Sequence, residues 1–400
     1  MSAPTALVWD PALPEYSFGP AHPMAPARLT LARELMDHFG LLDHVHQLSA
    51  PVATDAQLAR VHEADYINAL RRASHTPPDL TAEEAKRYGL DGEDCPPFPA
   101  MHQAAARLAG GTVRAAHFVL QGTGPRRAFN FSGGMHHAMP AKAAGFCLYN
   151  DAAVAIAEML ARGVRSVVYI DIDAHHGDGV EMMFRDDPRV TTISLHQHPS
   201  TLFPHTGLPS DIGGSNARGH ALNCALPPGC DDAAMLRALE AIAEPVLEHL
   251  EPDVVLTQHG CDGHHLDPLT DLGWTVDGMQ RATMLLADLI DAHSSGRWVA
   301  VGGGGYAVGQ VPARAWTHVL AVMAGAPIDP TTPLPASWRS QAATLSGRDI
   351  ANIPATMGDG GKCDFKPYSH GYNPADPIDQ AIRATRKAAF PDLGIDPMLI

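Results

Sequence analysis

The segment Asp171–Gly179, with the sequence DIDAHHGDG, contains side chains suited to binding a metal ion. Asp173 and His175 are two residues apart just after an expected strand, and alternate side chains of an extended chain point to the same side. Asp262 follows a second expected strand. A single loop aspartate is usually solvated or caps a helix, but three ligands that leave a position open for water are typical of catalytic zinc. Ferrous iron is an alternative for the same ligands.

Two consecutive histidines, His136 and His137, follow a pair of glycines in the segment SGGMHHAM. Histidine is the side chain best suited to proton transfer near neutral pH. Two neighbouring histidines could share one water, with one accepting its proton while the other delivers a proton to a leaving amine. Each needs a carboxylate on its second ring nitrogen. Asp171 and Asp178 flank the expected metal ligands and are available for this role.

Tyr306 follows a run of four glycines, Gly302–Gly305. Such a run lets the backbone approach a ligand closely, and the tyrosine hydroxyl could then donate to the oxyanion of a tetrahedral intermediate. The alternative is a flexible linker that ends in a buried aromatic residue. A phosphate-binding loop is excluded because no GK[ST] follows the glycines. Cys147 could be proposed as a nucleophile, but its apolar neighbours favour a small buried thiol.

Five apolar, β-branched runs immediately precede these polar segments and are expected to be strands: Arg127–Phe131, Ser166–Ile170, Val190–Leu195, Asp253–Leu256 and Arg297–Val301. Helical periodicity predicts five long helices: Pro26–Phe39, Ala104–Leu120, Asp151–Leu160, Asp232–Leu250 and Val276–His293. Strands separated by helices favour a parallel sheet with helices on both faces. Ligands bind at the carboxyl ends of such strands, where the polar segments gather.

The composition favours a compact enzyme. The chain has 400 residues, of which 45% are hydrophobic and 18% charged, with a formal net charge of −16. This charge disfavours a nucleic-acid partner, because phosphate backbones need a basic surface. The six scattered cysteines favour neither a disulfide framework nor a thiolate zinc site. The N-terminal residues do not read as a signal peptide and no run is long enough to span a membrane, so we expect a cytoplasmic protein.

In their order and spacing, six motifs resemble those of the zinc-dependent histone deacetylase superfamily: SGGMHHAM, GFCLYND, DIDAHHGDG, SLHQH, GCDGHHLDPL and GGGGY. The segments YSFGPAHPMAPARL and QHGCD…HHLDPLTDL are most similar to the bacterial acetoin-utilisation-type protein deacetylases. The resemblance implies the arginase/deacetylase α/β fold, a single domain over residues 1–400 with an eight-stranded parallel sheet. The catalytic motifs lie within residues 14–310. A helical and loop segment, 330–400, carries no motif.

The resemblance also assigns roles to individual residues. It implies three zinc ligands: Asp173, His175 and Asp262. His136 and His137 correspond to the general acid/base pair, and Asp171 and Asp178 to their carboxylate partners. Tyr306 corresponds to the hydroxyl that stabilises the transition state. Phe146 and Phe203 correspond to the two walls of the substrate tunnel, and Asp94 to the carboxylate at its rim. Gly145 and Gly304 are two further implied substrate contacts. Arg28 corresponds to the arginine that lines an internal acetate channel.

Members of this superfamily bind structural potassium beside the zinc. The implied site consists of the Ser194 hydroxyl and the backbone carbonyls of four residues: Asp171, Asp173, His175 and Leu195. A second potassium site would involve Phe184, Asp187 and Val190, where this sequence differs from the animal enzymes. Two pocket positions also differ, because Met135 stands where many animal members have tryptophan and Leu202 replaces a phenylalanine.

The implied reaction is zinc-dependent hydrolysis of an acetyl-lysine amide on a protein, which releases acetate and free lysine. An acetylated metabolic enzyme is one candidate substrate, and neither nucleic acid nor a membrane is expected as a partner. Three alternatives stay open. The substrate could be an acetylpolyamine or another small acylated amine, or the chain could bind acetyl-lysine without turnover. A dinuclear ureohydrolase would need extra acidic ligands where His176 and Gly177 stand. The sequence predicts no oligomeric state.

Overall fold

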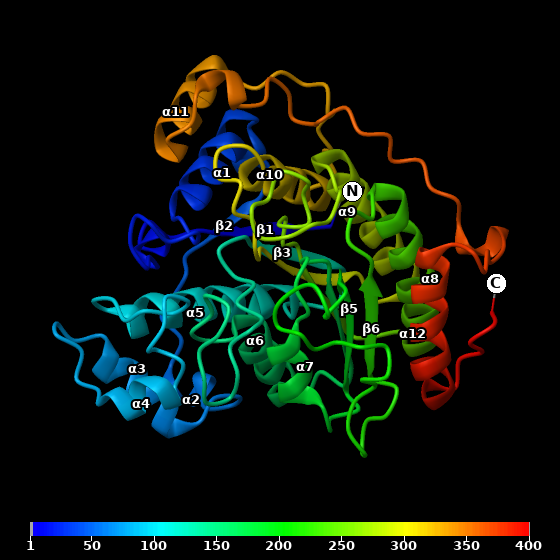
Figure 1. The fold of residues 1–400 in the computed structure, drawn as a ribbon, viewed down its shortest axis with the longest axis horizontal. Helices are drawn as coiled ribbons and strands as arrows, with labels where there is room; N and C mark the ends of the chain where they lie inside the picture. Colours follow the sequence, from blue (N-terminus) through cyan, green and yellow to red (C-terminus); the bar gives the residue numbers. More distant parts are fainter. Residues whose placement is uncertain (1–2, 400) are drawn as a thin grey trace.

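An eight-stranded sheet lies at the centre of the molecule, and all its strand pairs are parallel (Figure 1). The computed structural model describes residues 3–399. The strand order is β2-β1-β3-β8-β7-β4-β5-β6. In chain order the strands are β1 (Thr5–Val8), β2 (His46–Leu48), β3 (Arg126–Asn130), β4 (Val167–Asp171), β5 (Val190–Gln197), β6 (Ala221–Leu226), β7 (Val254–Gln258) and β8 (Arg297–Val301). The eight-stranded parallel sheet implied by the resemblance is confirmed.

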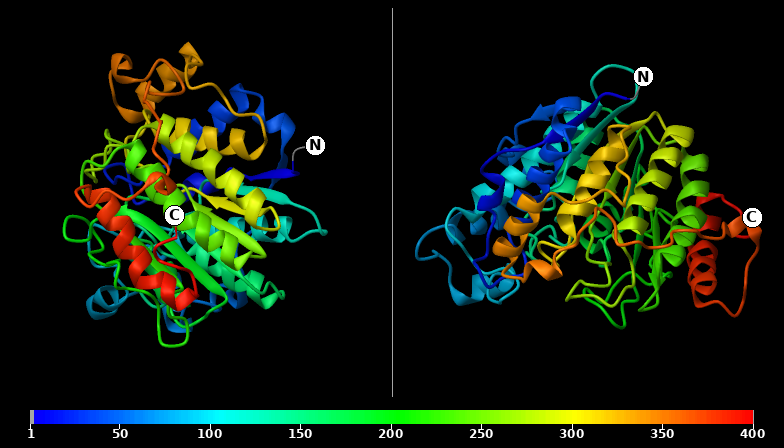
Figure 2. Two further views of the ribbon diagram at one scale, coloured as in Figure 1. Left: turned by 90° about the vertical axis from the view of Figure 1, so that its right-hand side faces the viewer. Right: turned by 90° about the horizontal axis from the view of Figure 1, so that it is seen from above.

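Helices cover both faces of this sheet (Figures 1 and 2). In chain order they are α1 (Ala27–His38), α2 (Asp55–Leu58), α3 (Ala64–Ala73), α4 (Ala82–Arg87), α5 (Met101–Val119), α6 (Asp151–Ala161), α7 (Asp178–Phe184), α8 (Asp232–Leu250), α9 (Val276–His293), α10 (Pro312–Met323), α11 (Ala336–Ser346) and α12 (Pro377–Leu393). Helices α5 and α6 pack together on one side, while α8, α9 and α10 cover the other. Within residues 3–399 we find no helix with the length and apolarity needed to cross a membrane.

The register of the central strands brings their carboxyl ends into line. Asp171 at the end of β4 lies opposite both Ser194 of β5 and Gln258 of β7. Gln258 in turn lies opposite Val301 of β8, which lies opposite Asn130 of β3. The segments that follow four neighbouring strands therefore start from one edge of the sheet. β4, β7 and β8 each contain two valines, and all four strands are almost wholly buried because helices cover them on both faces.

The five expected strands and five expected helices are all present, with bounds within three residues of those predicted. Three strands were missed. β1 and β2 have only four and three residues, too few to show a periodicity, and β2 is largely exposed. β6, with the sequence ALNCAL, interrupts its apolar run with an asparagine. That asparagine, Asn223, is buried because its side chain donates to Glu181 and to the carbonyl of Asp211.

The residues beyond α10 wrap back over the molecule. Helix α11 packs on α1, and α12 lies along the edge strand β6 and against α8. The Thr385 hydroxyl of α12 donates to the β6 carbonyl of Asn223 at 2.6 Å. Residues 347–376, which we call the C-terminal strap, connect α11 to α12 and cross the outer helices (Figure 2, orange). Helix α12 therefore protects a sheet edge that would otherwise be open for pairing.

An ion pair between α8 and α12 generates a stability prediction. Arg237 and Asp379 form two hydrogen bonds, of 2.6 and 2.9 Å, and the aspartate side chain is only 1% exposed. Asp379→Ala leaves the guanidinium largely buried without a counter-charge, so we expect a loss of about 3–5 kcal/mol in the free energy of unfolding, measured by urea denaturation. Asp392→Ala, on the same helix, breaks the exposed pair with Arg218 and should change it by less than about 1 kcal/mol. Equal losses in the two variants would contradict this account.

Candidate active site

Three side chains at the carboxyl edge of the sheet form a group that could hold a metal ion. Asp173 and His175 follow β4, and Asp262 follows β7. One ligand atom from each residue lies within 4.8 Å of the other two. His175 Nδ1 is 2.9 Å from Asp262 Oδ2 and 3.1 Å from Asp173 Oδ1. The sequence predicted that these three residues share one site, and the structure brings their side chains together.

The chemistry of this group fits a divalent cation. Both carboxylates are at most 1% exposed, so water does not screen their mutual repulsion. Burial and the charge of Asp173 raise the pKa of Asp262 above its ordinary value. Burial opposes a charge on His175, but the Asp262 and Asp173 charges outweigh it and raise its pKa to about 10. The site therefore favours positive charge between its two carboxylates, and oxygen and nitrogen ligands of this kind suit zinc or iron.

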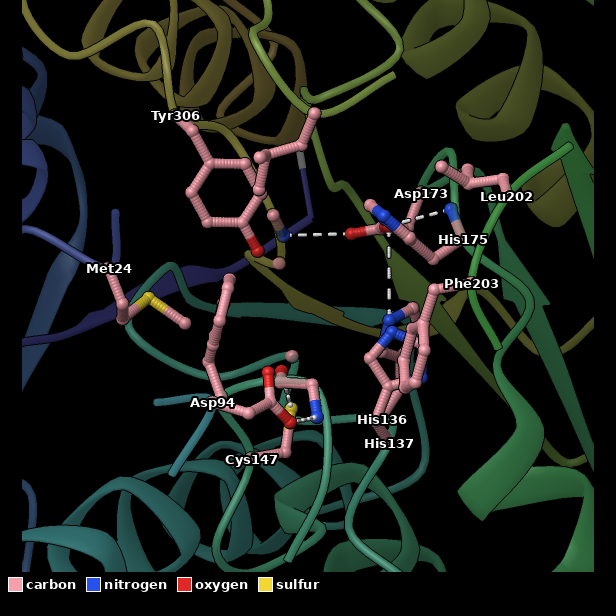
Figure 3. A pocket seen from close by; sticks show the side chains of 16 residues that line it. Met24, Asp94, His136, His137, Cys147, Asp173, His175, Leu202, Phe203 and Tyr306 are labelled. Carbon is pink, nitrogen blue, oxygen red and sulfur yellow. Dashed lines mark hydrogen bonds and ion pairs between the residues drawn. The ribbon is translucent and has the colours of Figure 1, made fainter. Parts of the chain in front are cut away.

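Each of the consecutive histidines is paired with the carboxylate expected from the sequence. His136 Nδ1 lies 2.7 Å from Asp171, and His137 Nδ1 lies 2.7 Å from Asp178. Because a carboxylate only accepts hydrogen bonds, both Nδ1 atoms are donors. In Figure 3 the two rings stand side by side on one wall of the pocket. Their centroids are 4.0 Å apart.

The two histidines differ in their electrostatic surroundings. Burial opposes a charge on His136, but the negative charges of Asp171 and Asp173 outweigh it and raise its pKa to about 9. Burial and the positive charge of His136 lower the pKa of His137 to about 4. Neighbouring titratable groups whose pKa values are driven apart are typical of acid/base machinery. His137 is therefore the member of the pair that the surroundings keep neutral.

Tyr306 lies across the pocket from the histidines, with its hydroxyl directed toward the pocket centre (Figure 3). The glycine run before it passes close to the metal-ligand group: a Cβ on Gly304 would lie 1.9 Å from Asp262 Oδ2. The Gly304 N–H donates to Asp173 Oδ2 at 2.7 Å. Burial and the nearby carboxylates raise the pKa of Tyr306 above its ordinary value, so the hydroxyl keeps its proton at neutral pH. The run is an ordered part of the site rather than a flexible linker.

These groups surround one cavity of about 300 Å³. Phe146 and Phe203 form walls, with Phe203 at the entrance and 41% exposed. Gly145 must lack a side chain, because a Cβ would lie 2.3 Å from the ring of His137. Its N–H donates to Asp94 Oδ2 at 2.7 Å, which places the carboxylate at the rim. The predicted substrate-contact residues of this pocket are thus brought together.

Arg28 lies behind the pocket rather than in its lining. Its guanidinium donates to the carbonyls of Gly303 and Gly305, at 3.1 and 3.2 Å, and lies 5.7 Å from the ring centre of Tyr306. Arg28 also lines a separate small pocket, together with Ser132 and Met135. Arg28 therefore supports the tyrosine loop, and its assignment to an acetate channel stays a prediction.

The potassium assignment also stays a prediction. Ser194 is opposite Asp171 in the sheet, and its hydroxyl lies 2.8 Å from His196 Nδ1.

Cys147 lines the pocket, but burial raises the pKa of its thiol, and its Sγ donates to the Gly145 carbonyl at 3.1 Å. The thiol is therefore protonated and poorly suited to act as a nucleophile.

The sequence assigned no role to Asp267, Leu269 or His176, which the structure places in or beside the site. Asp267 accepts from the backbone N–H of Tyr306 at 2.7 Å, and Leu269 lines the pocket. Asp267 and Leu269 both belong to the motif GCDGHHLDPL. The motif therefore pointed to this segment but did not indicate what these two residues contact. His176 is buried between Thr206, at 2.9 Å, and Glu181, at 3.0 Å, and thus fixes the loop that follows Phe203.

Comparisons with known proteins agree with this geometry. The histone deacetylase domain model matches residues 22–323. The acetoin utilization protein AcuC of Staphylococcus xylosus is 37% identical over 338 residues, which cover 84% of this chain and 87% of that protein. AcuC of Bacillus subtilis (strain 168) is 38% identical over 334 residues, with coverage of 84% and 85%. A crystal structure of an HDAC homologue complexed with SAHA superposes with a TM-score of 0.82 at 29% identity, covering 96% of this chain and all of that one. An HDAC homologue from Aquifex aeolicus gives a TM-score of 0.79, with the same identity and coverage.

The close approach of Gly304 to the metal-ligand group generates a prediction. Gly304→Ala must displace Asp262, so we expect zinc affinity to fall by at least about tenfold, as measured by equilibrium dialysis and elemental analysis. Gly124→Ala is the matched control, because nothing lies within 4 Å of its Cβ position. Unchanged zinc affinity in Gly304→Ala would show that Asp262 is not a ligand in this arrangement.

Proposed function

Because the chain belongs to the histone deacetylase family, we propose that it hydrolyses the amide of an acetylated lysine side chain in a protein, releasing acetate and free lysine. One observation supports this most strongly: two histidine–carboxylate pairs and Tyr306 face one another across a pocket that also contains the metal-ligand group. Amide hydrolysis needs this set, namely a base for water, an acid for the amine and a donor for the oxyanion.

The proposed metal is a single zinc ion held by Asp173, His175 and Asp262, with ferrous iron as the alternative. When bound, such an ion would polarise a carbonyl oxygen and lower the pKa of water. Structural potassium is proposed nearby, at the Ser194 hydroxyl and the carbonyls of Asp171, Asp173, His175 and Leu195. The carboxylate-rich surroundings of these carbonyls suit a second cation.

His137 is the proposed proton carrier. Its Nδ1 donates to Asp178, so Nε2 of the neutral ring is free to accept a proton from water and later deliver it to the lysine nitrogen. His136 is held by Asp171, which also accepts from the hydroxyl of Tyr169 at 2.6 Å. Its role is to stabilise charge beside His137 rather than to carry the proton.

Tyr306 is the proposed donor to the amide oxygen. Its hydroxyl keeps its proton and points into the pocket from the wall opposite the histidines. As the carbonyl carbon becomes tetrahedral, negative charge develops on its oxygen, and a preorganised O–H donor stabilises that charge more than it stabilises the ground-state carbonyl. The proton stays on the tyrosine oxygen throughout.

The substrate side chain is proposed to pass between Phe146 and Phe203, whose rings suit a chain of methylene groups. At the rim, Asp94 presents a carboxylate that could accept hydrogen bonds from the substrate backbone. An acetylpolyamine has the same methylene chain but no peptide backbone, so the rim supports the protein substrate over the small amine. The presence of every residue needed for turnover argues against a module that only binds acetyl-lysine.

The oxyanion role of the tyrosine is tested by Tyr306→Phe, which removes the hydroxyl and keeps the ring. We expect kcat to fall by about 10²–10³-fold with bound metal unchanged, because the lost contact matters chiefly in the transition state. Acetate release from an acetyl-lysine peptide and the metal content are measured in parallel. Turnover at the wild-type rate would rule out this role for Tyr306.

The substrate class is tested by comparing an acetylated protein with acetylputrescine. We expect kcat/KM to be about tenfold or more higher for the protein, because rim contacts to its backbone add to those in the tunnel. Tyr306→Phe serves as a control and should lower both rates, which shows that both substrates use one site. A higher kcat/KM for acetylputrescine would instead assign the chain to small acylated amines.

A further inference from the structure

The C-terminal strap places a carboxylate against the loops of the active site. Asp359 lies outside residues 22–323, which the family model matches, and in a segment that carries no recognisable motif. One of its oxygens lies 3.0 Å from His264 Nε2 and the other lies 2.8 Å from Arg314 Nη1. Both of these partners are completely buried. The strap therefore reaches two groups that the sheet and its helices hold in the interior.

His264 belongs to the loop after β7 that connects Asp262 to Asp267. Its Nδ1 accepts from the backbone N–H of Leu266 at 3.1 Å, so the proton resides on Nε2, which donates to Asp359. The carbonyl of His264 accepts from the N–H of Asp267 at 2.8 Å. Holding His264 in place therefore holds Asp267 as well.

Asp267 is the direct link to the tyrosine. One oxygen accepts from the N–H of Tyr306 at 2.7 Å, and the other accepts from the N–H of Leu269 at 3.0 Å. A carboxylate that accepts from a backbone N–H on each of two loops fixes them relative to each other. A displacement of the loop at Asp267 would therefore move the backbone from which the Tyr306 side chain projects.

Arg314 connects the same strap carboxylate to the other side of the tyrosine. It lies in the first turn of α10, the first helix after Tyr306, and its Nε donates to the Gln310 carbonyl at 2.6 Å. Asp359 thus contacts the loop that holds the Tyr306 backbone and the helix that follows it. The Asp359 carboxylate therefore joins the two segments that contact Tyr306 or follow it: the loop after β7 and helix α10.

The strap is itself firmly held at this point. The N–H of Asp359 donates to Asp277 of α9, and the N–H of Gly358 donates to the Pro330 carbonyl, both at 2.6 Å. Gly358 must be glycine, because a Cβ would lie 2.6 Å from Pro330. Asp359 also accepts from the N–H of Val276 at 2.8 Å. The start of α9 and Pro330 therefore hold the strap at this point independently of the active-site loop that it contacts.

We propose that Asp359 is a positioning residue for Tyr306, and that the C-terminal strap is in this way part of the catalytic unit. This inference rests on the proposed role of Tyr306 as oxyanion donor. A tyrosine hydroxyl that is displaced by a fraction of an ångström loses part of the hydrogen bond that forms in the transition state. The contact acts through His264 and Asp267 on one side and through Arg314 on the other.

The first test is Asp359→Asn, which keeps the shape but turns one acceptor into a donor that faces His264 or Arg314. We expect kcat to fall about tenfold, with KM changed less than about twofold and zinc content unchanged. Asp349→Asn is the matched control, because this aspartate lies in the same strap and caps only a local turn through the N–H of Ala351. It should leave kcat and KM at their wild-type values. An unchanged kcat in Asp359→Asn would overturn the proposal.

The second test separates positioning from general weakening of the fold. In a Tyr306→Phe background, Asp359→Asn should lower the residual kcat no further, because the hydroxyl that it positions is gone. If Asp359→Asn lowers kcat by the same factor in both backgrounds, Asp359 does not act through Tyr306. His264→Phe removes the loop side of the contact, together with the bond from the Leu266 N–H to the same ring, and leaves the contact between Asp359 and Arg314. It should show the same dependence on Tyr306, and it serves as the test if Asp359→Asn fails to fold.

A third measurement does not depend on activity. Hydrogen exchange of the peptide amides in residues 303–311 reports the N–H of Tyr306, which Asp267 protects. We expect this exchange to be faster in Asp359→Asn and unchanged in Asp349→Asn. Unaltered exchange in both variants would overturn the proposal. If the wild-type chain released no acetate at all, the proposed function would fail, while this measurement would still decide whether the strap holds the tyrosine loop.

Discussion

The repulsion between two buried carboxylates, Asp173 and Asp262, is the constraint on which the rest of the structure depends. Unit charges about 4 Å apart repel by about 4 kcal/mol at an effective dielectric constant near 20, so the pair persists only where the surroundings supply positive charge or donors. The parallel sheet creates the conflict, because its register ends β4 and β7 at the same level. Backbone N–H groups relieve part of it: Ala174 donates to Asp262 and Gly304 donates to Asp173.

The glycines of the site follow from the same constraint. For peptide N–H groups to solvate a carboxylate in place of water, the backbone must approach to hydrogen-bond distance, which leaves no room for a side chain. A Cβ on Gly260 would lie 1.9 Å from Asp173, and one on Gly304 would lie 1.9 Å from Asp262. The GGGGY segment therefore does two things: its backbone supports the charged centre, and its last residue is Tyr306. The proposed metal ligation and the proposed oxyanion stabilisation are therefore coupled, because one loop contributes to both.

What the sequence could predict depended on whether the signal was local. An apolar run followed directly by acids, histidines or glycines identified four strand ends of the site to within two residues. The histidine–carboxylate pairs were found because Asp171 and Asp178 flank the ligands in one short motif. Residue types and spacing suggested the metal ligands, the histidine pair and Tyr306, whereas the roles of the pocket walls, the rim carboxylate and Arg28 came only from the family resemblance. Asp359 could not be found in this way: its partner His264 is 95 residues away, and a lone aspartate in a glycine-rich segment forms no pattern.

Carboxylates recur wherever a functional group is held in this structure. Asp171 and Asp178 hold the two histidines, and Asp267 holds the backbone of Tyr306. Asp359 holds the loop after β7 through His264. An acceptor with two oxygens can join two donors from different segments, which neither an amide nor a hydroxyl does as strongly. The consequence is an excess of negative charge around the pocket. That excess favours a bound cation, and in the proposed reaction it would also stabilise the positive charge that a lysine amine acquires as it leaves. On that proposal, the groups that give the site its geometry also favour the charge of the product.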